Sequence, residues 1–142
     1  MRALLDVNVL IALLDSDHAL HASAIQWFAA NGKEGWASCP ITQNGCIRVM
    51  AHPGYPNALP VSTIVERLAE AASAPQHAFW PDDATLLDDA TVDTARIHGP
   101  GQLTDVYLLA LAVKHRGRLV TFDKSIALEA ARGAKRQHLL VL

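Results

Sequence analysis

The feature that most constrains the fold of this chain is the alternation of short apolar runs with longer segments of helical periodicity. The short runs predict strands over residues 2–7, 36–39, 77–80, 119–122 and 138–142. The intervening segments predict helices over residues 8–14, 18–31, 41–50, 62–72, 91–98, 104–115 and 125–134. Strands that alternate with helices favour a parallel sheet covered on both faces. The sequence therefore predicts an α/β fold with three layers (α/β/α) and a central, mostly parallel sheet of about five short strands.

The length and the cysteine content indicate a single cytoplasmic domain. The chain has 142 residues, of which 51% are hydrophobic, enough for one core but too few residues for two ordinary domains, so we expect one domain over residues 1–142. Cys39 and Cys46 have the spacing of neither a CxxC pair nor a disulfide framework, and we expect free thiols in a reducing compartment. No stretch approaches the ~18 apolar residues of a membrane span. We expect no membrane association.

The charge distribution gives only weak information about binding partners. A formal net charge of -2 argues against a protein that holds nucleic acid through a globally basic surface. Acidic residues crowd positions 82–93 and basic residues crowd positions 114–136, so a local basic face is one interpretation. Solvated turns and helix ends are the more common explanation of such runs.

Three aspartates occupy positions where a parallel sheet places functional groups. Asp6 ends the first predicted strand, Asp123 directly follows the fourth, and Asp105 lies in the first turn of the long apolar helix. Sites in open parallel sheets form outside the carboxyl ends of the strands, and an anion is also favoured at a helix N-terminus. If the first and fourth strands are neighbours, the three carboxylates converge on one edge of the sheet.

Converging carboxylates have a characteristic chemistry. They raise one another's pKa unless a cation lies among them, and hard oxygen ligands without His or Cys favour Mg²⁺ or Mn²⁺. Such an ion activates water and neutralises charge on a phosphate, which is the chemistry of phosphodiester hydrolysis. The residues alone leave the ordinary alternative open, in which the three aspartates end a strand, cap a helix and begin a turn.

Three segments of the chain resemble the hallmark blocks of PIN-domain toxins of the VapC family. They are residues 4–11 (LLDVNVLI), 103–112 (LTDVYLLALA) and 119–123 (LVTFD), which follow one another in the family's order and at its distances. The resemblance covers essentially the whole chain. It implies the toxin of a type II toxin–antitoxin system, an Mg²⁺- or Mn²⁺-dependent endoribonuclease that hydrolyses RNA, such as tRNA or rRNA, to arrest translation and growth. It further implies a homodimer and inhibition by a VapB-like antitoxin.

The same resemblance assigns roles to individual residues. Asp6 and Asp105 match the principal metal ligands, and Asp123 completes the acidic cluster. Asn8 and Thr121 match positions that support the site through hydrogen bonds.

Two basic residues lie close to these blocks in the sequence. Arg48 and Lys124 are candidates for contacts with the RNA backbone, because phosphate groups are bound mainly by Arg and Lys. Surface ion pairs are an equally good interpretation of both.

The chain departs from the family at one position. The family commonly carries a Glu in the helix after the second strand, and the corresponding block, residues 41–48 (ITQNGCIR), has Gln43 there. A neutral amide can bind a metal-bound water or a phosphate, but it cannot act as a base. Gln43 remains a catalytic candidate, and its neutrality leaves open whether the site holds one metal or two.

Two other functions remain compatible with the sequence. Phosphotransferases that form an aspartyl-phosphate also carry an Asp at the end of the first strand, but they typically have DxD where this chain has Asp6 and Asn8. A catalytically weakened PIN-like module that only binds RNA or protein would account for Gln43. Three retained carboxylates argue against that decay.

Overall fold

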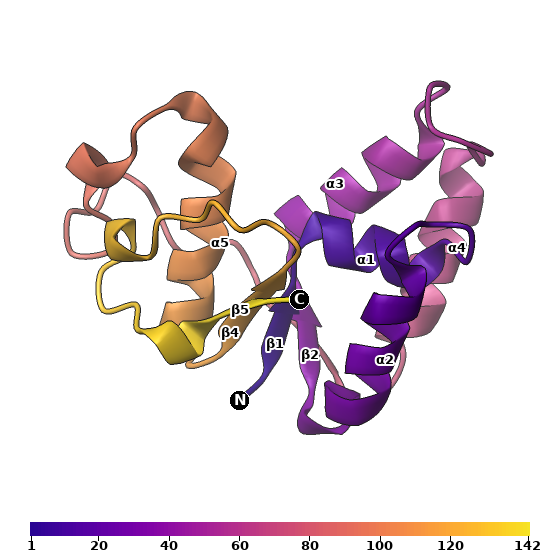
Figure 1. Cartoon of the computed structure of the whole chain (residues 1–142), viewed down its shortest axis with the longest axis horizontal. Helices are drawn as coiled ribbons and strands as arrows, with labels where there is room; N and C mark the ends of the chain where they lie inside the picture. Colours follow the sequence, from indigo (N-terminus) through magenta and orange to yellow (C-terminus); the bar gives the residue numbers. More distant parts are fainter.

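A computed structural model describes all residues from Met1 to Leu142 and shows a five-stranded sheet in the order β3-β2-β1-β4-β5 (Figure 1). Every pairing in this sheet is parallel. The strands are β1 (Ala3–Leu5), β2 (Trp36–Ser38), β3 (His77–Phe79), β4 (Arg118–Thr121) and β5 (Leu139–Val141). The helices are α1 (Val7–Leu14), α2 (His21–Asn31), α3 (Pro40–Ala51), α4 (Val61–Ala72) and α5 (Leu103–Lys114).

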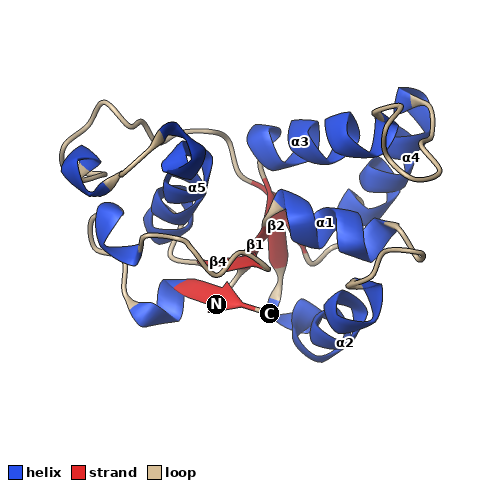
Figure 2. Ribbon diagram, turned by 45° about the horizontal axis from the view of Figure 1, so that its top comes forward, coloured by secondary structure: helices blue, strands red, loops and turns tan.

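The sheet separates two helical layers, which confirms the three-layer prediction. Figure 2 shows α5 on one side of the strands and α1, α2, α3 and α4 on the other. Alternate residues of β1 enter different cores, because successive side chains of a strand point to opposite faces. Leu4 packs in the α5 core, whereas Ala3 and Leu5 pack in the core formed with α1, α3 and α4. The sheet is therefore buried on both faces.

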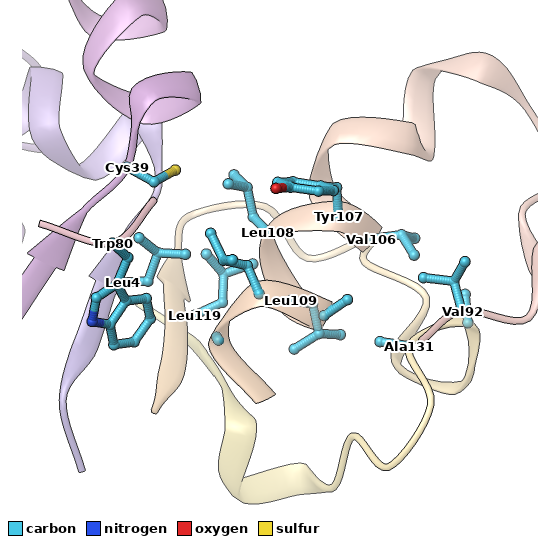
Figure 3. Close-up of a cluster of buried hydrophobic side chains, with 14 of the residues drawn as sticks. Leu4, Cys39, Trp80, Val92, Val106, Tyr107, Leu108, Leu109, Leu119 and Ala131 are labelled. Carbon is cyan, nitrogen blue, oxygen red and sulfur yellow. The ribbon is translucent and has the colours of Figure 1, made fainter. Parts of the chain in front are cut away.

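Helix α5 is the central element of its layer. Seven consecutive residues from Val106 to Ala112 are buried, as the apolar sequence of the helix predicts. Leu108 and Leu109 extend toward the side chains of Leu4 and Leu119 on the sheet (Figure 3). This packing fixes the N-terminal turn of α5, and with it Asp105, relative to the ends of β1 and β4.

Two of the predicted helices do not form. Residues 91–98 and 125–134 are irregular apart from short 3-10 turns at Thr94–Arg96 and Leu128–Ala130. The two segments instead pair with each other through an antiparallel bridge between Val92 and Ala131. The Asp93 N–H donates to Ala130 O at 2.8 Å and the Arg132 N–H donates to Thr91 O at 2.9 Å. These bonds use the backbone groups that a helix would need, so tertiary pairing replaces local periodicity.

The start of α5, the two cysteines and the lengths of the helices also bear on the sequence predictions. Helix α5 begins at Leu103 after a 3-10 turn, one residue before the predicted start, so Thr104, which the sequence offered as the cap of this helix, lies within it. Cys39 and Cys46 are free and buried, as predicted. None of the helices combines the length and the apolar character needed to cross a bilayer.

Gly117 provides a test of how closely α5, β1 and β4 are packed. A Cβ atom at this position would lie 2.5 Å from the backbone oxygen of Arg2 and 2.6 Å from Trp80 Cη2. We expect Gly117→Ala to lower the free energy of unfolding by about 1–3 kcal/mol through overpacking, as measured by urea denaturation. Gly99→Ala is the matched control, because nothing lies within 4 Å of its Cβ position and its φ of -176° is extended. Equal effects of the two substitutions would contradict this account of the packing.

Candidate active site

The strand order brings the predicted site segments together at one edge of the sheet. β1 pairs with β4 so that Leu5 lies opposite Val120, which places Asp6, directly after β1, beside Thr121, the last residue of β4. Their neighbours β2 and β5 continue the sheet in opposite directions from this central pair. Ligands of open parallel sheets bind at such a switch point, outside the carboxyl ends of the strands.

Asp6 is held rigidly at the junction between β1 and α1. It caps α1, since its Oδ1 accepts a hydrogen bond from the Val7 N–H at 2.7 Å. Its Oδ2 accepts a bond from the Thr121 hydroxyl, also at 2.7 Å. Only 6% of the residue is exposed. Burial raises the pKa of this carboxyl, and the negative charge of Asp123 adds to the increase, whereas the two hydrogen bonds oppose it.

Thr121 connects the junction between β1 and α1 with the segment that follows β4. It is fully buried, and while its hydroxyl donates to Asp6, its oxygen accepts bonds from Asn8 Nδ2 at 3.2 Å and from the Asp123 N–H at 3.0 Å. Asn8 reaches back to the same strand, because its Oδ1 accepts a bond from the Phe122 N–H at 3.2 Å. Asn8 and Thr121 therefore lie where the sequence predicted supporting residues, in contact with the site and with each other.

The pKa values of Asp105 and Asp123 are shifted in opposite directions although each residue influences the other. The pKa of Asp105 is raised to about 6, mainly by burial and then by the negative charges of Asp6 and Asp123. The pKa of Asp123 is lowered, mainly because Ser125 donates two hydrogen bonds to its Oδ1, from its hydroxyl at 2.6 Å and from its N–H at 2.8 Å. The structure thus brings Asp6, Asp105 and Asp123 close enough for their charges to repel one another.

The donor chemistry of this group fits a hard divalent cation. All available atoms are carboxylate oxygens, and their mutual repulsion is what a cation among them would relieve. In the geometry of this structure, no group of three or more His, Cys, Asp or Glu side chains could hold a metal ion by itself. Water molecules can complete the coordination of Mg²⁺, which usually retains several of them.

Gln43 lies apart from the carboxylates. Its Nε2 donates to Ser38 Oγ at 2.9 Å, and Ser38 Oγ in turn pairs with His77 Nε2 at 2.8 Å. Gln43 also lines a shallow hollow against α4, and it makes no hydrogen bond with the three aspartates. The residue of α3 that faces the start of α1 is Gly45, whose Cβ position would lie 2.6 Å from Val7 Cγ2.

The two predicted phosphate contacts are exposed but differently placed. Lys124 directly follows Asp123, whereas Arg48 lies near the C-terminal end of α3, beside Tyr55. Neither takes part in an ion pair, so the ion-pair interpretation is not realised in this structure. Ser125 also belongs to the site and was not predicted, although a Ser two residues after an Asp is a common turn pattern that could have indicated it.

This sheet, with carboxylates at the β1–β4 switch point and on the first turn of α5, defines the class of PIN-domain proteins. The PIN domain family model matches residues 3–132, so the chain belongs to this family.

Curated relatives define the branch of the family. The chain is 53% identical to Ribonuclease VapC44 of Mycobacterium tuberculosis (strain ATCC 25618 / H37Rv) over 142 residues, which is 100% of both chains. It is 40% identical to Ribonuclease VapC39 of the same strain, covering 94% of this chain and 96% of that relative. The chain therefore belongs to the VapC family of PIN-domain toxins, as its three sequence blocks predicted.

Solved structures agree on the fold. VapC20 of Mycobacterium tuberculosis, a toxin that cleaves the sarcin–ricin loop, matches with a TM-score of 0.60 at 14% identity, over 87% of this chain and 91% of that chain. VapBC2 of Rickettsia felis, bound to a DNA fragment from its promoter, matches with a TM-score of 0.55 at 14% identity, over 87% and 89%. At such identities the likeness establishes the shared fold.

The raised pKa of Asp105 predicts a pH-dependent effect of neutralising it. Because its folded-state pKa of about 6 exceeds the ordinary value of 3.8, the native state binds the proton more tightly, and stability falls as pH rises through this window. In EDTA, we expect Asp105→Asn to raise the free energy of unfolding at about pH 8 by about 1 kcal/mol, allowing for solvent screening. The gain should vanish below about pH 4.

Urea denaturation across this pH range measures the effect. Glu129→Gln is the control, since Glu129 is exposed and has no ion-pair partner. A variant less stable than the wild type at about pH 8 would show that Asp105 makes favourable contacts that outweigh the repulsion.

The Thr121 hydroxyl is expected to be necessary for both stability and activity. Thr121→Val keeps the side-chain shape but leaves Asp6, Asn8 and the Asp123 N–H without their shared partner, so unfolding free energy should fall by about 1–3 kcal/mol. Metal affinity or cleavage should fall about 10- to 100-fold, as for other residues that orient ligands. Thr121→Ser retains the hydroxyl and should recover most of the activity. A Val variant as active as the wild type would exclude this role.

Proposed function

We propose that this chain is an Mg²⁺- or Mn²⁺-dependent endoribonuclease, with Asp6, Asp105 and Asp123 as its metal ligands and catalytic carboxylates. The observation that carries the proposal is the convergence of three aspartates at the switch point of the sheet, where burial first and then their mutual repulsion raise the pKa of Asp105 to about 6. A protein gains nothing in stability from such repulsion, so a function that needs concentrated negative charge explains it best. The names of the curated relatives as ribonucleases support the same assignment.

The chain's own residues prepare this site in distinct ways. Thr121 and the Val7 N–H fix both oxygens of Asp6, and Ser125 fixes Asp123 in its ionised form. Asp105, with a pKa near 6, releases its proton at neutral pH and becomes available as a ligand. When bound by these carboxylates, Mg²⁺ or Mn²⁺ supplies an activated water and neutralises charge on the scissile phosphate.

The remaining site residues fit supporting roles. Lys124, exposed beside Asp123, is placed to contact an RNA phosphate. Gln43 contacts Ser38, so within this proposal it influences the site through the end of β2.

The biological setting follows from the relatives. VapC20 cleaves the sarcin–ricin loop, and VapBC2 is a complex bound to its promoter DNA. We extend these properties to this chain as a single-domain toxin that cleaves tRNA or rRNA in the cytoplasm, arrests translation and growth, forms a homodimer and is inhibited by a VapB-like antitoxin. A basic antitoxin side chain is well suited to block the acidic site, because the Arg fork matches carboxylates.

One specific observation favours a second function. Gln43 replaces the usual Glu, and its amide points to Ser38 and not to the carboxylates. A PIN-like module that binds RNA or protein without cutting it would account for this arrangement.

Cleavage of a mixed tRNA and rRNA pool by purified protein tests the proposal. We expect discrete fragments in Mg²⁺ or Mn²⁺ and none in EDTA. Asp6→Asn should reduce cleavage by more than about 100-fold, because loss of a ligand exceeds the loss of a residue that orients one. Glu129→Gln should cleave normally. A folded wild-type protein that binds metal but cuts no RNA in the pool would overturn the nuclease assignment in favour of the binding module.

A further inference from the structure

A polar cavity lies at the far end of the helices that begin at the candidate active site. It has a volume of about 230 Å³ and lies between the C-terminal end of α1, the loop from α3 to α4, and α4 itself. Met50, Leu59 and Ile64 are among its apolar lining residues, and polar side chains surround them. The cavity is smaller than the pockets of about 300–1,000 Å³ that hold drug-sized ligands, so it suits a single ring system.

Two opposite charges line this cavity without partners. Asp15 is already occupied, because the Tyr55 hydroxyl and the Asp17 N–H donate to its carboxylate. The carboxylate of Asp17 and the guanidinium of Arg67 form no ion pair, either with each other or with another residue, and neither side chain is hydrogen-bonded. One exposed acceptor, Asp17, and one exposed donor, Arg67, therefore line the same cavity, and both are free to bind a molecule.

The cavity is within reach of an RNA strand held at the carboxylates. Helix α1 starts at its cap Asp6 and ends at Leu14, beside the cavity, a length of about 12 Å at 1.5 Å per residue. Tyr55 and Pro56 also line an adjoining hollow with Arg48 and His52. Arg48 has no ion-pair partner, so it can hold a phosphate on the way from the scissile bond to the cavity.

We propose that this cavity binds one guanine base of the RNA substrate, a few nucleotides from the bond that is cut. The proposal rests on the proposed ribonuclease function and adds a determinant of its sequence preference. It requires an unstacked base, which is how sequence is usually read in single-stranded RNA.

Guanine matches the carboxylate of Asp17 and the guanidinium of Arg67 better than the other bases do. Its Watson–Crick edge offers N1–H and N2–H₂ to a carboxylate such as Asp17, and its O6 and N7 accept a bidentate contact from an arginine such as Arg67. Adenine presents an unprotonated N1 to the carboxylate, which is repulsive, and an amino group in place of O6 to the guanidinium, which leaves only N7 as an acceptor. Asn57 can contact the base edge as donor or acceptor.

Cleavage of RNA with randomised positions around the cut site tests the proposal on the intact protein. We expect the wild type to prefer guanine at one fixed position, and Arg67→Lys and Asp17→Asn each to lower that preference about tenfold while preferences elsewhere stay unchanged. Arg136→Lys, which alters an exposed arginine outside the cavity, is the matched control. Equal loss of cleavage for all sequences, or an unchanged guanine preference, would overturn the proposal.

A binding measurement separates this inference from the nuclease assignment. NMR titration of the wild type with guanosine 5′-monophosphate should shift the signals of Tyr55, Asn57 and the Arg67 Nε–H group, and cytidine 5′-monophosphate should shift them less. These shifts in a protein that cuts no RNA would preserve the base site and overturn only the nuclease. Cleavage with no guanine preference and no shifts would overturn only the base site.

Discussion

The pairing of β1 with β4 is the contact on which the site depends. It joins segments separated by more than a hundred residues and places the buried Thr121 hydroxyl 2.7 Å from Asp6 Oδ2. Loop closure over such a distance has an entropic cost that only burial on both faces of the sheet offsets. Leu4 and Leu119 provide that burial on the side of α5. The same packing therefore stabilises the fold and positions the carboxylates.

The site in turn opposes the stability that the sheet provides. Asp6 is almost fully buried and Asp105 partly so, and burial is the largest cause of the raised pKa of each. A buried carboxylate that ionises beside others carries an energetic cost that the surrounding structure must offset. Hydrogen bonds offset this cost for only two of the three carboxylates. Thr121 donates to Asp6 and Ser125 donates to Asp123, whereas no side chain outside the group donates to Asp105. In the metal-free protein, Asp105 is therefore the carboxylate of this group whose ionisation is least compensated by hydrogen bonds.

The parts of the fold that local sequence specifies were predictable. Short apolar runs gave all five strands, and the apolar sequence of α5 gave a buried helix with Asp105 in its first turn. Residues 91–98 and 125–134 were predicted wrongly, because the bridge between Val92 and Ala131 depends on two segments that no local pattern connects. Sequence blocks located the three aspartates, but they could not show which neighbours hold each carboxylate. The two hydrogen bonds from Ser125 were not predicted, although its turn pattern is visible in the sequence, and the cavity at the end of α1 emerged only from the three-dimensional arrangement.

The packing of α3 against α1 restricts where α3 could add a carboxylate to the group of Asp6, Asp105 and Asp123. Gly45 faces Val7, directly after Asp6, and a Cβ atom there would lie only 2.6 Å from Val7 Cγ2. A side chain at this position would first have to displace the side chain of Val7, which opens the helix that Asp6 caps. Gln43, two positions earlier in α3, directs its side chain toward Ser38 and α4. The close approach of α3 to α1 thus disfavours a carboxylate at position 45, and α3 contributes packing and a hydrogen-bonded amide to this end of the sheet.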